Sequence, residues 1–431
     1  VMNTDAACPL TGRDSARFGK EKHPMTTNAD AITVQDRVRK AVREARIFDI
    51  HTHLYSKGFG GLLLRGIDEL LTYHYLVAET VRWGVIGADA FYALPKREQA
   101  DLVWKTLFLD HSPVSEACRG VLTVLERFGL GVASRDLASY REFFESMSVD
   151  EHTDRVFELA GVDSVVMTNG PFDDQEHSLW LKGVDRDPRF KAALRVDPLL
   201  NNWEQTNETL RCWGYDVSDY LDHKATSEVR RFLHEWIDRT QALYLAVSLS
   251  PDFQFPDSSF RTILTSECLL PVAEERGVPF ALMIGVKRQV NPALRLAGDS
   301  VGKADITSVE HLCANYPNNK FMVTMLSREN QHELAVAARK FPNLMVFGCW
   351  WFLNTPTLIE EITRMRLDLL GPGMIPQHSD CRVLDQLLYK WEHSRELIGE
   401  ALARQYANLA ATGWNVTDEE IRRDVEGLFG G

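Results

Sequence analysis

A (β/α)8 barrel of the TIM type, with a large helical insertion after its first strand, is the fold that the sequence predicts. Three observations predict it. Eight short apolar runs recur along the chain, amphipathic segments separate most of them, and the connection after the first run is far longer than the others. Alternating strands and helices in this number are typical of a closed parallel barrel. A doubly wound open sheet is the alternative that the same alternation allows.

Each apolar run is nearly continuous, as expected for a strand that is covered on both faces. Polar or turn residues follow each run, so the strands are expected to be short. Segments such as 259–277 and 306–317 have the helical pattern of apolar residues and are expected to be helices between strands. The eight expected strands lie within residues 46–53, 163–170, 190–198, 242–251, 279–285, 320–327, 343–352 and 373–380.

The long connection after the first run has helical patterning of its own, for example in residues 66–84 and 96–110. We therefore expect residues 54–162 to form a helical insertion over the barrel mouth, within a catalytic domain of residues 33–431. Residues 1–32 are polar, contain Gly and Pro, and show no clear period. They are expected to form a mobile tail.

The composition limits the classes of partner. The 431 residues are 45% hydrophobic and carry a formal net charge of -13. This acidic balance disfavours nucleic acid and anionic membranes as partners, but one or two local arginines can still hold an anionic substrate.

No apolar run reaches the ~18 residues that span a bilayer. The 7 cysteines are scattered without C-x-x-C spacing, which favours reduced thiols in a cytoplasmic protein. A homo-oligomer is expected, as for many such enzymes.

Two histidines end the first run, as His51-Thr52-His53. In a barrel the active site gathers at the C-terminal ends of the strands. Residues two apart in a strand point to the same side, so both imidazoles can face the mouth. Two neutral imidazoles and a carboxylate form a familiar site for a divalent metal. Two histidines that are satisfied by ordinary hydrogen bonds explain this short pattern equally well.

The last run supplies a carboxylate, because it closes with His378, Ser379 and Asp380. In a closed barrel the eighth strand lies beside the first, so Asp380 can complete a metal site with the two histidines. An N-cap for a helix from Val383 onward is the alternative role for Asp380. Geometry alone leaves both open. His378 precedes Asp380 by two residues and can share its face.

Five segments together have a recognisable order: "FDIHTHL", "LLTYHYLVAE", "AALRVDP", "FGCWWF" and "QHSDCRVL". They resemble the motifs of uronate isomerases, which are members of the amidohydrolase superfamily. The resemblance covers residues 34–431 and is closest to the shorter, bacillus-type branch. H-x-H alone is weakly specific, but H-x-H with the His-Tyr pair, the Trp-Trp stretch and the D-x-R ending is strongly specific.

The resemblance implies one divalent metal, with His51, His53 and Asp380 as its ligands. Zinc is favoured by two imidazoles and one carboxylate, and manganese or another metal is the alternative. The resemblance also implies that His74 and Tyr75 form an active-site pair, which the inserted helices bring to the pocket.

Four further residues follow from the resemblance. Arg195 and Arg382 are expected to meet an acidic sugar. Trp350 and Trp351 match the tandem tryptophans of the family. We expect one of them to line the pocket, because alternation in a strand lets only one face inward.

The fifth run departs from the wider family. Met283 stands where longer uronate isomerases carry a histidine, and the sixth run ends without a metal-type histidine. These differences argue for at most one metal and against hydrolysis by a metal-bound hydroxide. Lys287 and Arg288 follow closely and can place charge over the mouth. A solvated loop is the commoner role for such residues.

The activity that the resemblance implies is aldose–ketose isomerisation of D-glucuronate to D-fructuronate and of D-galacturonate to D-tagaturonate. A proton leaves C2 and returns at C1 through an enediol, which needs no nucleotide cofactor. The lack of a Gly-rich phosphate loop agrees with this.

Asp380 is the expected base, with His74, Tyr75 and Arg195 as further catalytic groups. Arg382 is the expected bidentate partner of the substrate carboxylate, although the metal can hold that carboxylate instead. Two other functions stay open: a mononuclear metal-dependent hydrolase or lactonase acting on a sugar acid, and a catalytically dead sugar-acid binding protein.

Overall fold

The computed structural model describes residues 28–430. Within this range seven parallel strands form one curled sheet, and their order in the sheet equals their order in the chain. This order confirms the barrel and excludes a doubly wound sheet, in which the strand order reverses. The strands are β1 (Ile47–Thr52), β2 (Val162–Asn169), β3 (Phe190–Arg195), β4 (Ala242–Leu249), β5 (Phe280–Ile284), β8 (Phe321–Met325) and β9 (Leu344–Val346).

The eighth expected strand is an irregular extended segment that closes the barrel. On one side the Ile375 backbone N–H donates to the Val346 carbonyl at 3.1 Å. On the other side the Asp380 N–H donates to the His51 carbonyl at 3.1 Å. Regular pairing is interrupted because Pro376 has no N–H, and because Asp380 has a left-handed φ of 54°. The closure places the end of this segment beside β1, as the sequence predicts.

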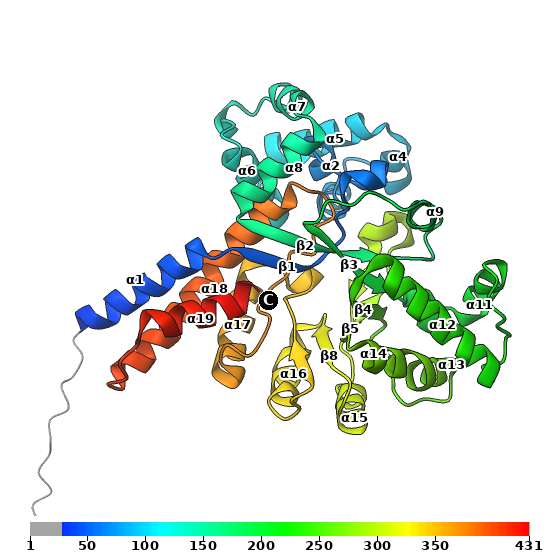
Figure 1. The fold of residues 1–431 in the computed structure, drawn as a ribbon. Coiled ribbons are helices and arrows are strands. Elements are labelled where there is room, and N and C mark those ends of the chain that lie inside the picture. Colours follow the sequence, from blue (N-terminus) through cyan, green and yellow to red (C-terminus); the bar gives the residue numbers. More distant parts are fainter. Residues whose placement is uncertain (1–27, 431) are drawn as a thin grey trace, which may run out of the picture.

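The segment after β1 is helical, as expected. Several of its helices start at a side chain that accepts a backbone N–H, as Ser115, Asp136 and Ser148 do. In Figure 1 most of these helices gather in one group beside β1 and β2. They are α2 (Ile67–Leu71), α3 (His74–Arg82), α4 (Ala88–Ala93), α5 (Lys96–Trp104), α6 (Glu116–Arg127), α7 (Leu137–Ser146) and α8 (Val149–Ala160).

The remaining helices surround the barrel (Figure 1). They are α9 (Asp174–Lys182), α10 (Asp197–Asn201), α11 (Trp203–Cys212), α12 (His223–Thr240), α13 (Phe260–Ile263), α14 (Leu270–Arg276), α15 (Thr307–Asn315), α16 (Gln331–Ala338), α17 (Pro356–Leu370), α18 (Gln386–Ala411) and α19 (Asp418–Phe429). α1 (Asn28–Glu44) packs along α18 and α19. α1 therefore includes the last residues of the predicted tail, and residues 1–27 lie outside the described range.

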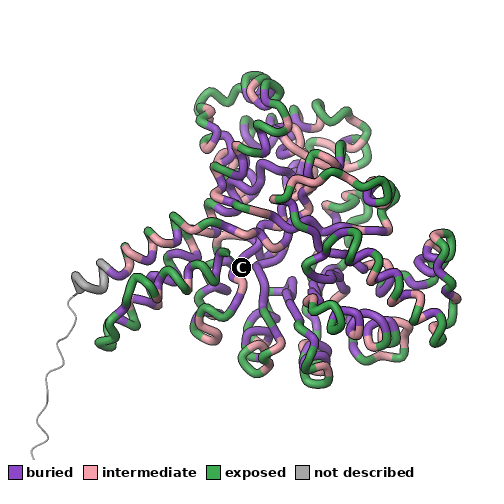
Figure 2. Tube along the Cα trace, viewed as in Figure 1, coloured by how far each residue is buried: buried purple, intermediate pink, exposed green. Residues whose placement is uncertain are grey.

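Burial is concentrated along the strands, while the outer helices expose one face (Figure 2). Every residue of β5 and of β8 is buried, which explains their continuous apolar sequences. The barrel interior has its own apolar cluster, which includes Tyr244, Met283 and Phe347. This packed interior forms the floor of the mouth. No helix in the described range is long and apolar enough to cross a membrane.

A short antiparallel hairpin follows β5. Its strands are β6 (Val286–Lys287) and β7 (Ser300–Val301). Gly285 allows the chain to turn into β6, since its φ of 120° is rarely adopted by other residues. The hairpin carries residue 288 to the mouth of the barrel.

Candidate active site

A pocket lies at the C-terminal ends of the strands. Eight of the nine residues expected from the sequence line it, and Tyr75 is the exception. Tyr75 instead lies behind His74, at 4.6 Å between ring centroids, with its ring stacked on Phe352. The lining residues are His51, His53, Tyr73, His74, Arg195, Ser248, Met283, Arg288, Trp350, Trp351, Asp380 and Arg382.

Two imidazoles and one carboxylate converge at the floor of the pocket. Asp380 Oδ1 lies 3.7 Å from His51 Nε2 and 3.3 Å from His53 Nε2. One ligand atom from each residue falls within 4.8 Å of the others, as a bound metal requires. Asp380 Oδ1 and His51 Nε2 are buried and have no hydrogen-bond partner among the described residues. Since an unpaired buried polar atom is costly, a divalent cation suits this group.

The alternative role of Asp380 as a helix cap is wrong. The helix that follows, α18, begins at Gln386, and its N-cap residue is Asp385. Asp380 instead has a left-handed backbone, with a φ of 54°, which is uncommon for a residue other than Gly. Backbone strain of this kind is concentrated at functional sites, where the surrounding structure holds it. This conformation directs the carboxylate toward the two histidines.

Burial keeps the pocket histidines neutral. Loss of hydration lowers the pKa of His51 and of His53 well below the ordinary value. The nearby charge of Arg382 lowers the pKa of His53 further. Burial also lowers the pKa of His74, whose Nε2 atom is buried without a described partner. Neutral imidazoles have a free lone pair, so they can bind a cation or accept a proton.

The two predicted arginines differ in how their charge is balanced. Arg195 Nη2 lies 2.5 Å from Asp197 Oδ1, and a second hydrogen bond joins Nε to Asp197 Oδ2 at 3.1 Å. The guanidinium of Arg382 makes no hydrogen bond or ion pair within the described chain. Arg382 therefore brings an unbalanced positive charge into the pocket, where a substrate carboxylate can pair with it.

Both tryptophans line the pocket, so the expectation that only one faces inward is wrong. The regular strand β9 ends at Val346, and Trp351 starts a 3-10 turn, η7 (Trp351–Leu353), with a φ of 47°. Alternation in a strand does not apply to such a turn. The indole Nε1 of Trp351 is buried without a described partner, so it is a free donor at the pocket wall.

Arg288 is a pocket residue for which the sequence favoured a solvated loop. Its guanidinium pairs with Asp299 at 2.7 Å, and the side chain of Asp299 is only 1% exposed. The same guanidinium lies over the Trp351 ring, 5.9 Å from its centroid. Met283 lines the pocket without a polar group. Near the end of β5, the polar side chain that lines the pocket is therefore Arg288 of the hairpin and not a residue of the strand.

Tyr73 and Ser248 are pocket residues that sequence reasoning missed. Tyr73 directly precedes the expected His-Tyr pair, and it is the extended N-cap residue of α3. Its tilted ring lies 4.1 Å from that of His74. Ser248 lies near the end of β4 and accepts a hydrogen bond from Arg195 at 3.3 Å. The start of α3 could have been predicted from the sequence, but the inward direction of the Tyr73 side chain could not.

His378 lies behind His51 and does not line the pocket. Their ring centroids are 5.0 Å apart. Gly348 makes room for this ring, because a Cβ atom at that position would lie 2.0 Å from His378 Cδ2. Burial lowers the pKa of His378 to about 4, so the ring is neutral. His378 therefore belongs to the packing beneath the site.

Solved structures of three other proteins resemble this one. A uronate isomerase from Bacillus halodurans is 57% identical, with 93% of this chain and 94% of that chain covered at a TM-score of 0.91. The chain belongs to the uronate isomerase family. A uronate isomerase from Thermotoga maritima is 16% identical, with 96% and 98% covered and a TM-score of 0.73. A glucuronate isomerase from Caulobacter crescentus is 15% identical, with 95% of each chain covered and a TM-score of 0.71.

The last two similarities show the shared fold. Neither a family model nor a curated protein sequence matches the chain. Membership of the family makes the chain an isomerase. The pocket at the barrel mouth is the candidate active site of this uronate isomerase, and its His-His-Asp group suggests a divalent metal site.

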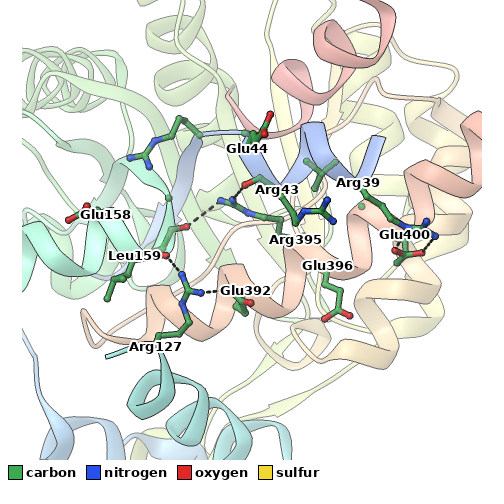
Figure 3. A pocket seen from close by; sticks show the side chains of 16 residues that line it. Arg39, Arg43, Glu44, Arg127, Glu158, Leu159, Glu392, Arg395, Glu396 and Glu400 are labelled. Carbon is green, nitrogen blue, oxygen red and sulfur yellow. Dashed lines mark hydrogen bonds and ion pairs between the residues drawn. The ribbon is translucent and has the colours of Figure 1, made fainter. Parts of the chain in front are cut away.

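A larger cavity, of about 610 Å³, lies at the other end of the barrel (Figure 3). Its five arginines are matched by five glutamates. Arg395 donates to the carbonyls of Arg43 and Ala160, at 2.7 and 3.3 Å, and thus satisfies the ends of α1 and α8. These residues precede β1 and β2. The N-terminal end of a barrel serves stability, so this cavity is not the active site.

Proposed function

We propose that the pocket interconverts D-glucuronate with D-fructuronate, and D-galacturonate with D-tagaturonate, by moving a proton between C2 and C1 through an enediol. The observation that carries this proposal is the convergence of His51, His53 and Asp380 beside the unbalanced charge of Arg382. A uronate offers both a carboxylate for the arginine and adjacent oxygens for the other groups.

Asp380 is the proposed base for the C2 proton. It is the one carboxylate among the residues that line the pocket, and its Oδ1 atom has no hydrogen-bond partner in the described chain. A base must reach the proton that it removes, and Asp380 is among the residues that line the pocket. The same residue is a proposed metal ligand with His51 and His53.

Zinc is the proposed metal, because two imidazoles and a carboxylate suit it, and manganese is the alternative. When bound, such a cation would polarise substrate oxygens and stabilise negative charge near them.

His74 is the proposed carrier of the proton between O1 and O2. It lines the pocket, it is neutral, and its Nε2 atom is unpaired in the described chain. A neutral imidazole can accept a proton at one oxygen and return it to the other. Tyr75 packs against His74 and fixes the orientation of its ring.

Arg195 is the proposed donor to the enediolate. Its two hydrogen bonds to Asp197 fix the guanidinium in the mouth before the substrate arrives. Donors that are oriented in advance stabilise a developing negative charge without further rearrangement.

Arg382 is the proposed partner of the C6 carboxylate, with Trp350 and Trp351 as the walls beside the sugar. The planar guanidinium can donate two parallel hydrogen bonds to a carboxylate. Trp351 adds the free indole donor described above.

A homo-oligomer and a cytoplasmic location stay predictions from the sequence.

The test is to incubate the purified protein with D-glucuronate and with D-galacturonate and to follow ketose formation. We expect both ketoses to form, whereas the corresponding sugar-acid lactones are not hydrolysed. Lactone hydrolysis without ketose would favour the hydrolase alternative. Binding of either uronate without any turnover would favour the catalytically dead binding protein.

A further inference from the structure

His51 and His53 each have one ring nitrogen toward Asp380 and the other on a hydroxyl group. His51 Nδ1 lies 3.0 Å from the Tyr244 hydroxyl. His53 Nδ1 lies 2.9 Å from Thr168 Oγ1. The two hydroxyls come from different strands, Tyr244 from β4 and Thr168 from β2. The same contact is therefore built twice.

The direction of these hydrogen bonds follows from the other partner of each hydroxyl. Tyr244 donates to the Ile50 carbonyl at 2.8 Å. Thr168 donates to the Thr52 carbonyl at 3.0 Å. Each accepting carbonyl belongs to the residue just before a pocket histidine. A hydroxyl has a single proton, so once it has been donated the oxygen can only accept.

Each histidine must therefore carry its proton on Nδ1. In a neutral imidazole the other nitrogen, Nε2, then holds the lone pair. Nε2 is the atom that lies near Asp380 in both His51 and His53. The tautomer that a cation needs is thus fixed by protein atoms alone.

The two hydroxyls are shielded from solvent, so water does not compete for these contacts. Tyr244 is 1% exposed and Thr168 is 3% exposed. Tyr244 belongs to the apolar cluster inside the barrel, where the polar tip of its ring would otherwise be costly. Its hydroxyl is satisfied by the His51 ring and the carbonyl that precedes it.

We propose that Tyr244 and Thr168 are positioning residues that lock His51 and His53 in the tautomer that binds the metal. This inference rests on the proposed cation site and deepens it. Partners of this kind, which hold the second nitrogen of a metal-binding histidine, change metal affinity by about 10–100-fold when they are removed.

The first test compares the affinity of metal-free protein for Zn²⁺, measured by competition with a coloured chelator. We expect Thr168→Val, which keeps the shape and loses the hydroxyl, to bind Zn²⁺ about 10–100-fold more weakly than the wild type. Thr168→Ser keeps the hydroxyl and is expected to stay within about threefold. Tyr244→Phe should weaken binding as Thr168→Val does, through His51 instead of His53.

Thr324→Val is the matched control. Thr324 lies in β8, is fully buried, and has a hydroxyl without a described partner. The same chemical change is made inside the barrel without touching a pocket histidine, so zinc affinity should not change. Equal affinities for Thr168→Val, Thr168→Ser and Thr324→Val would overturn the inference.

The second test reads the tautomer directly, from ¹⁵N chemical shifts of metal-free protein labelled at histidine. The wild type and Thr168→Ser should each show His53 with a protonated Nδ1 and an unprotonated Nε2. Thr168→Val should show a mixture, and an unchanged tautomer would overturn the inference.

Two further outcomes are separable. If Thr168→Val does not fold, Tyr244→Phe repeats both tests through His51. If the wild type binds no Zn²⁺ or Mn²⁺, the cation site fails, and this inference fails with it. If the wild type binds zinc and both hydroxyl-deleted variants bind it equally well, the inference alone fails.

Discussion

The two ends of the barrel use the same kinds of side chain in opposite ways. The cavity at the N-terminal end (Figure 3) combines five arginines with five glutamates, and four of these arginines donate to backbone carbonyls or to carboxylates. The pocket at the C-terminal end has unpaired buried atoms on His51, His74, Trp351 and Asp380. It also contains the unpartnered guanidinium of Arg382 within the described chain.

This difference separates stability from function. Most of the arginines at the N-terminal end are already satisfied by carboxylates and backbone carbonyls, so few of their donors are left for a ligand. Groups that are buried and unpaired cost folding free energy, and such a cost is expected where a ligand or a cation completes the hydrogen bonds. Two residues of the pocket also have a left-handed backbone, Asp380 with a φ of 54° and Trp351 with a φ of 47°.

The largest expected effect comes from the carboxylate at the pocket floor. Asp380→Asn keeps the size of the side chain and removes both its charge and its basicity. We expect kcat to fall by about 10³-fold or more, since the C2 proton then has no base. The thermal midpoint of the metal-free protein should not fall, because an unpaired buried charge has been removed. Retention of a tenth of the wild-type kcat would contradict the role of Asp380.

The next effect concerns the unbalanced arginine. Arg382→Lys retains the charge and loses the planar fork, so we expect kcat/KM for D-glucuronate to fall by about 100-fold. Arg382→Met should lower kcat/KM further. Steady-state kinetics with both uronates measures this. Activity of the lysine variant within a few-fold of the wild type would show that a bidentate contact is not needed.

A smaller effect is expected at the hairpin. Arg288→Met should raise KM for D-glucuronate by about tenfold with little change in kcat, because Arg288 lines the pocket but is not one of the groups proposed to move a proton. Lys287→Met is the control, since Lys287 is exposed and does not line the pocket. Equal KM values for the two variants would place Arg288 outside the substrate site.

At the N-terminal end the expected effect is on stability alone. Arg395→Met removes the donor to the Arg43 and Ala160 carbonyls, and we expect the free energy of unfolding to fall by about 1–2 kcal/mol. Chemical denaturation measures the loss, and isomerase kinetics should be unchanged. A change in KM or kcat would break the contrast between the two ends.

The smallest effect concerns a satisfied carboxylate at the same end as the pocket. Glu176 accepts hydrogen bonds from Tyr55, Asn169, Gly170 and Trp180, yet burial raises its pKa above the ordinary 4.5. The folded state therefore binds this proton more tightly than the unfolded chain. Stability from this group is present below pH 4.5 and is lost as pH rises through the raised pKa.

Glu176→Gln removes the titration while keeping the shape of the side chain. We therefore expect the free energy of unfolding of the wild type, relative to that of the variant, to be lower at pH 7 than at pH 4. Denaturation curves at the two pH values provide the measurement. A difference that grows with pH would show that the donors, and not burial, control the pKa of Glu176.

The sequence predicted the barrel and much of the pocket because both depend on local patterns. Continuous apolar runs define strands that are covered on both faces, and the polar residue that ends each run must lie at the mouth. His51, His53 and Asp380 are such residues, and barrel closure brings the first and last runs together. Arg195 at the end of β3 follows the same logic.

Other site residues follow from contacts between distant segments. Tyr244 and Thr168 lie inside apolar strands, where a hydroxyl looks like a packing residue until its partner is seen. Arg288 belongs to a turn whose form depends on the buried carboxylate of Asp299. Trp351 faces the pocket because of one left-handed backbone angle, which no periodicity predicts.

One measurement tests the central claim most directly: D-glucuronate is incubated with the enzyme in heavy water and the ketose is examined by NMR. Proton transfer through an enediol, with Asp380 as the base, predicts ketose that carries solvent deuterium at C1, and no ketose from Asp380→Asn. Ketose formed at an undiminished rate by Asp380→Asn would contradict it.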